Sequence, residues 1–512
     1  GTGLIDQEAG ILELERLPAD QALPSWSKAR WLADALPPRE LANMPDVDPA
    51  AEVLIAAGIN HRRGGLPWFL AAAGHLERAR SMAEQFVTLA DGVPSGILVI
   101  SATGHAYFGL GLAHAALGHP DDATRAFSRA REIYDRINHH AVIGFTLLSE
   151  LQDVLLPYHA DRIEERRRMT EAAETALNRA GGAFPSDRYA LRARLMLHFL
   201  DGRWDEAAAI ADATPEQATF ALRRTITNAL APIWFYRGDD ERLHEHIHAL
   251  LPQGPSAAPG GIVYLDGLLL QRLAAAQAID RGDLVTAAAW LEANNHWLDW
   301  NGSVLGRAEN QIAWSRYFRA CEDLPRAVAF AERAVEYASE PRQPLALLAA
   351  LRTRGEQYIE LGVVDLAADD VMTARVLADA CAAPLERALT LLSMASFHRA
   401  TNQPAAGEAD LTTARDICTA LRAHRALSWI ARLGGSPREP EPKMEAVPVA
   451  GLTPREVEVL RLVSQGMTDA QVAGILFISP RTVGQHLRSI YAKLDVSTRA
   501  AATRIAVERG LG

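Results

Sequence analysis

Apolar residues recur at helical spacing, three and four positions apart, along most of this chain of 512 residues. No stretch alternates apolar and polar residues as a half-buried strand does, and no strand–helix–strand rhythm is visible. From about residue 60 to residue 430 the periodic segments are rich in Ala and follow one another closely. The pattern therefore predicts an all-α protein built from consecutive amphipathic helices.

The helical region also repeats with a period of 40 residues. In each repeat a small residue is followed by a turn residue seven positions later, a second small residue after five more, and a last residue after seven more. This register is seen in Ala275/Gly282/Ala287/Asn294, Ser315/Glu322/Ala327/Ala334, Gly355/Gly362/Ala367/Ala374 and Ala395/Asn402/Gly407/Ala414. A fifth instance is Gly111/Gly118/Ala123/Ala130, and weaker ones lie around Gly74/Ala79, Gly202/Ala207 and Gly238/Leu243.

Small residues at this spacing have a packing role. Two antiparallel helices approach closely only where their side chains are small, a tight turn joins them, and the next pair stacks on top. The pattern resembles tetratricopeptide repeats in a longer form, and the resemblance implies an α-solenoid whose concave face binds a protein, a peptide or a small effector. Trp290, Trp297 and Trp300 are candidates to line that face, and the alternative is that they pack between repeats.

The last 62 residues, 451–512, have the pattern of a compact four-helix domain. Thr453 followed by Pro454, with Glu456 three positions after the cap, predicts the start of a first helix. A short second helix is expected from Thr468, and a fourth after Ser497.

The third helix of this domain is expected over 480–494, after Ser479. One face carries an apolar stripe and the other is polar and basic, as a helix in the major groove of DNA requires. The stripe is Val483, Leu487, Ile490 and Leu494, and the polar face is Arg481, Thr482, Gly484, Gln485, Arg488 and Ser489.

Residues 451–509 resemble the LuxR-type (GerE-like) helix-turn-helix domain, and the whole chain resembles the C-terminal part of MalT-like large regulators. The resemblance implies duplex DNA as the partner, with Gln485 and Arg488 reading base edges, since Gln suits adenine and Arg suits guanine. It implies that phosphate contacts come from Ser479, Arg481, Thr482, Lys493, Thr498 and Arg499. His486 either makes a structural hydrogen bond or contacts DNA. Gly484 is a departure, because many relatives carry a long polar side chain there.

Charge is unevenly distributed along the chain. The net charge is −11, whereas residues 451–512 hold eight Lys and Arg against five Asp and Glu, a net +3, which leaves −14 for residues 1–450. Phosphate binding needs local positive charge, so DNA affinity is expected at the C-terminal end only. A single domain of this charge would bind weakly, so a homodimer on DNA is expected.

The chain divides into a helical repeat domain over 1–433, a linker over 434–450 with four prolines, and the helix-turn-helix domain over 451–512. Residues 1–60 have helical character without a clear assignment. Three scattered Cys indicate no disulfide framework or zinc cluster. The uncharged stretch from Gly92 to Pro120 contains three His and several Gly, which favours a buried repeat helix over a membrane span. A cytoplasmic protein without membrane contact is predicted.

Enzymatic motifs are weak or missing. His244-Glu245-His246-Ile247-His248 matches the zinc-protease pattern, but the repeat register places Leu243, Ile247 and Leu250 inward and the histidines on the flank. No phosphate-binding P-loop is present, and no enzyme activity, cofactor or metal is predicted.

The sequence therefore predicts a transcriptional regulator controlled by an effector or protein that binds the repeat domain, with RNA polymerase as a candidate partner. The alternative is a helical-repeat adaptor whose DNA-binding head is degenerate, a hypothesis that Gly484 favours. A zinc hydrolase is the third and weakest hypothesis.

Overall fold

The computed structural model describes residues 66–90, 97–180, 187–212, 220–260, 263–433, 454–464, 467–469, 472, 480–494, 496 and 498–508. Contacts divide the chain into two units, Gly1–Gly435 and Ser436–Gly512, which are taken separately below. Within the described ranges the regular structure is helical, with one isolated bridge between Ser339 and Arg342 and no strand. The predicted all-α class is confirmed for these ranges.

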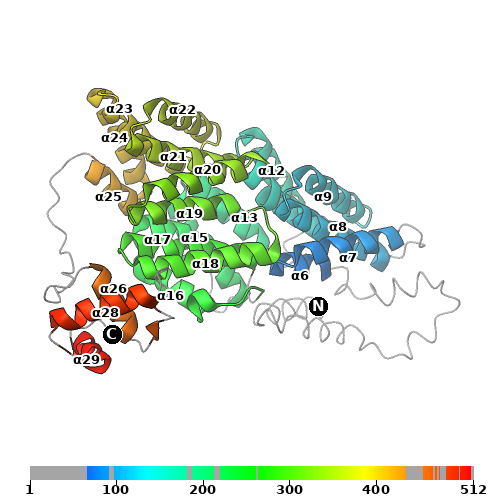
Figure 1. The fold of residues 1–512 in the computed structure, drawn as a ribbon. Helices are drawn as coiled ribbons and strands as arrows, with labels where there is room; N and C mark the ends of the chain where they lie inside the picture. Colours follow the sequence, from blue (N-terminus) through cyan, green and yellow to red (C-terminus); the bar gives the residue numbers. More distant parts are fainter. Residues whose placement is uncertain are drawn as a thin grey trace, which may run out of the picture. The chain divides into compact units, whose positions relative to one another are not determined.

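The first unit consists of antiparallel helix pairs that lie side by side (Figure 1). The early pairs are α6 (Leu66–Ala73) with α7 (Leu76–Ala90), α8 (Ile97–Ala116) with α9 (Pro120–Asp135), α13 (Asp187–Leu200) with α14 (Trp204–Asp212), and α15 (Phe220–Arg237) with α16 (Asp240–Leu250). The later pairs are α17 (Tyr264–Asp280) with α18 (Leu284–Asn301), α19 (Arg307–Ala320) with α20 (Leu324–Ser339), α21 (Pro344–Leu361) with α22 (Val364–Ala380), and α23 (Pro384–Ala400) with α24 (Pro404–Leu421). Helix α25 (His424–Leu433) ends the unit, and a short 3-10 turn, η2 (Gly254–Ser256), precedes α17.

The repeat register predicted from the sequence corresponds to these pairs. Its turn position adopts a left-handed backbone each time, with φ of +76° at Gly282, +60° at Glu322, +74° at Gly362 and +58° at Asn402. Glycine and, at lower cost than most residues, asparagine tolerate this conformation. The small residues of the register lie at the helix contacts, where Ala275, Ala287, Ser315, Ala327, Ala334, Ala367, Ala374, Ala395 and Ala414 are fully buried.

One helix pair was not apparent in the sequence. Helix α10 (His140–Glu150) continues through a π-helical turn, η1 (Leu151–Leu155), into α11 (Leu156–His159), and this long element pairs with α12 (Ile163–Arg179). The turn at 160–162 contains no glycine, and its residues do not have the left-handed φ of the other turns. A small residue is still needed where α10 and α12 cross, because a Cβ on Gly144 would lie 2.7 Å from Cγ of Leu177.

The row of helix pairs coils so that each early pair contacts the pair about five places later. One turn of this coil, about five pairs, is called a winding below. The turn at Gly118, between α8 and α9, meets Val304, which follows α18, and Pro341, which follows α20. The amide of Val304 donates to the carbonyl of Ala116 at 2.8 Å. Gly202, between α13 and α14, in the same way meets Pro384 and Leu421. Turns within the first five pairs therefore dock on the loops between later pairs.

Arginines reinforce this contact between successive windings. Arg166 on α12 donates to the carbonyl of Cys381 at 3.0 Å. Arg425 on α25 donates to the carbonyl of Phe235 at 2.8 Å, and its guanidinium pairs with Asp240 and Asp280. The windings thus stack directly on each other, and residues some 190 positions apart share one core.

The three tryptophans of α18 had two possible roles, lining a concave face or packing between repeats. Trp290 and Trp297 are buried, and Nε1 of Trp297 donates to the carbonyl of Ala257 at 3.0 Å. Trp300 is half-buried with its ring 4.8 Å from that of His75, on an early pair. Of the two alternatives, burial therefore favours packing between repeats for Trp290 and Trp297. In the described part of the chain, no helix has the length and apolar character needed to cross a membrane.

Two glycines with similar φ angles make it possible to test how much the contact between windings contributes to stability. Gly118 and Gly282 have φ of +86° and +76°, but a Cβ would lie 2.9 Å from Cγ2 of Val304 at position 118 and within 4 Å of nothing at position 282. Gly282→Ala should lower the free energy of unfolding by about 1 kcal/mol, from backbone strain alone. Gly118→Ala should cost roughly 1–3 kcal/mol more because of overpacking. If urea unfolding shows the same decrease in the free energy of unfolding for both variants, the stacking of the windings is contradicted.

Candidate nucleic-acid interface

The second unit has a core of its own, built from three helices whose ends are described. These are α26 (Pro454–Ser464), α28 (Pro480–Leu494) and α29 (Arg499–Glu508). The buried residues are Val459, Leu460, Leu462, Val463, Val472, Val483, Leu487, Ile490, Ala502 and Ala506. Helix α28 has the bounds predicted for the third helix, with Val483, Leu487 and Ile490 buried and Leu494 half-buried, so its predicted apolar stripe is confirmed.

A buried carboxylate joins α26 to α28. Glu456, only 4% exposed, accepts a hydrogen bond from Oγ of Ser489 at 2.6 Å through Oε1. Its Oε2 pairs with Nζ of Lys493, also at 2.6 Å. Burial makes a carboxylate costly unless it is paired and hydrogen-bonded, so these two contacts hold the flank of α28 against α26.

A second ion pair fixes the start of α29. Nη1 of Arg499 pairs with Oδ1 of Asp469 at 2.5 Å, and its Nη2 donates to the carbonyl of Met467. Thr498 precedes the helix, and its Oγ1 accepts from the amide of Ala501 at 3.2 Å. Thr498 therefore acts as the N-cap of α29, a role that the sequence analysis gave to Ser497.

The predicted phosphate-binding residues thus divide into two groups. Lys493, Thr498 and Arg499 each make a contact that stabilises the domain. The partners of Lys493 and Arg499 are distant in sequence, and for this reason neither ion pair was predicted. Ser479 and the side chains of Arg481, Thr482 and Gln485 lie outside the described residues.

Arg488 differs from the other described cations. Its side chain is exposed, and its Nε donates to the carbonyl of Gly484 at 3.3 Å, one turn earlier in α28. No acidic residue of the described ranges pairs with its guanidinium. His486 is half-exposed, and its ring makes no hydrogen bond within the described ranges.

The polar face of α28 is consequently split. Ser489 and Lys493 are on the flank that docks on α26, whereas Gly484 and Arg488 lie on the other flank and stay open. The sequence analysis placed Ser489 on the DNA side, and the structure corrects this by pairing it with Glu456.

The zinc-protease motif falls on the outer surface of α16. His244, Glu245 and His248 are exposed. Of the predicted inward stripe, Leu243 and Ile247 are buried and Leu250 is half-buried. The rings of His244 and His248 are 6.4 Å apart and parallel. No third ligand joins them, and no group of three metal-ligating side chains occurs in the described ranges.

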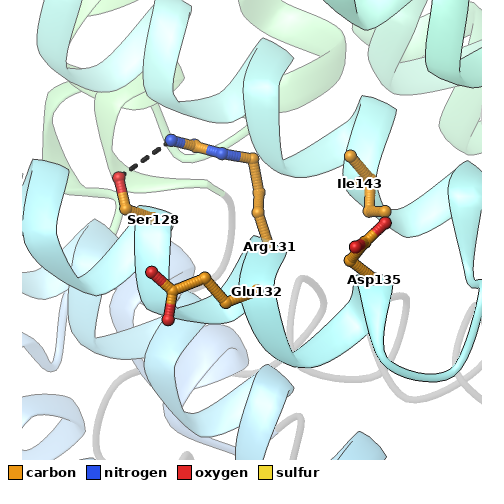
Figure 2. Close-up of a pocket in the computed structure, with 5 residues that line it drawn as sticks. All are labelled: Ser128, Arg131, Glu132, Asp135 and Ile143. Atoms are coloured by element: carbon orange, nitrogen blue, oxygen red, sulfur yellow. Dashed lines mark hydrogen bonds between the residues drawn. The ribbon is translucent and has the colours of Figure 1, made fainter.

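An open hollow of about 410 Å³ lies between α9 and α10 of the repeat unit (Figure 2). Its lining residues are Ser128, Arg131, Glu132, Asp135 and Ile143. Arg131 donates to Oγ of Ser128 at 2.9 Å and pairs with Glu150, and Glu132 pairs with Arg129. Burial raises the pKa of Glu150 despite the neighbouring guanidinium. Because its charged groups, Asp135 apart, are already paired, the hollow offers little to a polar ligand.

Residues 450–506 match the family model for bacterial regulatory proteins of the luxR family. The C-terminal domain is therefore a LuxR-family helix-turn-helix domain, carried by a chain of helical repeats.

Similar proteins include HTH-type transcriptional regulators. One, from Mycobacterium bovis, is 37% identical over 106 residues, which cover 21% of this chain and 12% of that protein. The nitrate/nitrite response regulator protein NarP of Escherichia coli is 44% identical over 59 residues, 12% of this chain and 27% of NarP. The aligned segment thus spans only about an eighth of the length of the first curated relatives.

A signal transduction ATPase of Pyrococcus horikoshii with a tetratricopeptide repeat sensor aligns over 91% of this chain and 72% of its own. The identity is 10% and the TM-score 0.28, which is too low to establish a shared fold.

Because Lys493 and Arg488 have different surroundings, substitution by Met should affect the stability of the domain differently at the two positions. Lys493→Met should lower the free energy of unfolding by about 1–2 kcal/mol, because it leaves the buried Glu456 carboxylate without its cation, although Lys493 is itself a third exposed. Arg488→Met should change it by less than about 0.5 kcal/mol, as for most exposed side chains. Hydrogen exchange of the α28 amides measures both, and similar protection in the two variants would refute the structural role of Lys493.

Proposed function

We propose that the chain is a DNA-binding transcriptional regulator whose helix 480–494 enters the major groove. The observation that supports this most directly is the geometry of α28. One edge of the helix is buried, and one flank is tied to α26 through Glu456. The opposite flank presents Arg488, which has no carboxylate partner among the described residues. An exposed arginine on such a helix suits the acceptor groups of a base edge.

Phosphate contacts would then come from groups around this flank. Arg481 and Thr482 stand at the start of α28, where backbone amides also favour an anion. Lys493 and Arg499 can approach phosphates only while they share their charge with Glu456 and Asp469. One domain therefore has a modest positive charge, which favours binding as a homodimer to a two-fold related site.

The repeat unit is proposed to bind the controlling partner, an effector or another protein. The net charge of −14 over residues 1–450 disfavours DNA, and the helix pairs offer a large surface. RNA polymerase remains a candidate partner, and the cytoplasm is the proposed location.

Salt dependence is the test of the DNA-binding activity. Two domains on one duplex, each with at least two phosphate contacts, should give a slope of log affinity against log salt of about −4 or steeper. Arg488→Ala should weaken the preferred duplex by roughly 1–3 kcal/mol and relax the preference at one base pair. The salt slope and the effect of Arg488→Ala are both measured by fluorescence anisotropy with the full chain and a duplex selected from a random pool.

The outcomes separate the two functional hypotheses. Binding with a steep salt slope and a sequence preference supports the regulator. An intact, folded chain that binds no duplex at low salt would favour the alternative, a repeat adaptor with a degenerate head.

A further inference from the structure

The first helices of the later pairs enclose an inner face of the repeat unit. Helices α15, α17, α19, α21, α23 and α25 each contact the next, and α25 contacts α15 again, so they close a ring. The second helices, from α16 to α24, each pack on two neighbouring members of this ring and cover its outer side. Side chains of the ring that point to neither neighbour nor outer layer therefore face its inside.

Half-buried and exposed positions mark this inner face. On α17, Arg272 and Ala276 are half-buried and one turn apart, among buried neighbours. On α19, Glu309, Ala313 and Arg316 follow at spacings of four and three, the first two half-buried and Arg316 exposed. Water therefore reaches the inner face, although helices surround it.

Tyr236, near the end of α15, shows which charges share this face. Burial raises the pKa of its phenol, although part of the side chain still meets solvent. The phenol also interacts with charges on four other helices of the ring, namely Glu386, Arg316, Arg352 and Arg425. A group that interacts with charges on α19, α21, α23 and α25 lies inside the ring with them. Its hydroxyl makes no hydrogen bond to the described residues.

Several charged side chains of the ring are paired with each other. Arg352 pairs with Glu386 at 2.7 Å, and Nε of Arg319 donates to Glu360 at 2.6 Å, in both cases between neighbouring helices. Arg425 is bonded to α15, α16 and α17 as described above. These groups hold the ring together and are not free to bind a ligand.

Three charged side chains of the inner face are left without an ion pair to the described residues: Arg272, Glu309 and Arg316. Nη1 of Arg272 and Oε2 of Glu309 are shielded from solvent, and neither is hydrogen-bonded within the described ranges. Burial lowers the pKa of Arg272, and the Glu309 carboxylate opposes this effect. A buried polar atom without a partner is costly, so these groups call for a partner from outside the chain.

The ring limits the size of such a partner. About five helices to a winding, with axes about 9 Å apart, place the centre of the ring about 8 Å from each axis. A helix with its side chains has a radius of about 5–6 Å, so a peptide helix could not enter. Ala276 and Ala313, each one turn or less from an unpaired arginine, leave room for a small molecule only.

We propose that this inner face binds a small organic anion. Its carboxylate or phosphate group lies between Arg272 and Arg316 and accepts a hydrogen bond from the Tyr236 hydroxyl. Glu309 accepts a hydrogen bond from a hydroxyl or ammonium group of the same molecule. The inference rests on the proposed role of the repeat unit in binding an effector, and it adds the place and the chemical class.

The test follows the reactivity of single arginines in the full chain. Phenylglyoxal modifies guanidinium groups that solvent reaches, and peptide mass spectrometry gives the rate at each site in chloride, phosphate or acetate of equal ionic strength. Phosphate or acetate should slow the modification of Arg316 by about fivefold or more relative to chloride. Arg415, which is exposed on α24 and has no ion pair in the described ranges, should change by less than about twofold.

The two anions distinguish the possible ligands, since protection by phosphate alone indicates a phosphorylated compound and protection by acetate alone indicates a carboxylic acid. Protection by both supports an anion site that accepts either group.

Two variants test the assigned residues. Arg272→Gln should raise the anion concentration needed for half-protection of Arg316 by about tenfold or more. Tyr236→Phe keeps the ring contacts with Trp204 and Trp429 and should raise it about threefold. Arg415→Gln is the matched control and should change nothing. Thermal unfolding verifies that each variant is folded, and Tyr236→Phe carries the comparison if Arg272→Gln is not.

The failures are distinguishable. If Arg316 reacts at the same rate in all three salts, or if the folded variants are protected like the wild type, water alone satisfies these groups and the inference is overturned. None of these measurements contains DNA. A chain that shows the protection but binds no duplex would overturn the proposed function and leave the anion site standing.

Discussion

Close approach of helices at small residues is the constraint on which the repeat unit depends. At the crossing of α8 and α9 a Cβ on Gly111 would lie 2.9 Å from the ring of Phe127, and at the crossing of α21 and α22 a Cβ on Gly355 would lie 2.7 Å from Cγ2 of Val371. A larger side chain would force such a pair apart. Because turns of early pairs dock on loops of pairs about five places later, a displacement at one crossing also disturbs a distant contact. The small-residue register therefore sets both the helix pairs and the way they wind.

The helix-turn-helix domain uses a different device. Its core is small, and the orientation of α28 depends on a buried carboxylate as well as on apolar packing. Glu456 binds two residues on one flank of α28, and this leaves the ridge of Gly484 and Arg488 on the opposite flank. A buried ion pair contributes little net stability compared with apolar packing, but it selects one arrangement of the groups that it joins. Here the arrangement that it selects exposes an arginine.

The fold could be predicted from the sequence wherever the signal was local. The turn glycines, the small residues at the crossings and the limits of α28 all follow from spacing within about 20 residues. The pair formed by α10 and α12 did not, because its turn has no glycine and its first helix contains a π-helical turn. The stacking of windings and the ion pairs of Lys493 and Arg499 could not be predicted either, since they join residues that are 30 to more than 200 positions apart and no local pattern records them. For the same reason the tryptophans of α18 were open to two interpretations, and only their burial decided between them.

The ion pairs bear on how such a protein would respond to a signal. Lys493 and Arg499 share their charge with Glu456 and Asp469, so one domain attracts phosphates less than its count of basic residues suggests. Under the proposed function, occupancy of a site then depends on how many domains reach the same duplex, because each additional domain multiplies the affinity. A repeat unit whose windings are stacked and bonded is poorly suited to large changes of its own curvature. A partner bound to it would act more effectively by changing the assembly of chains than by bending one of them.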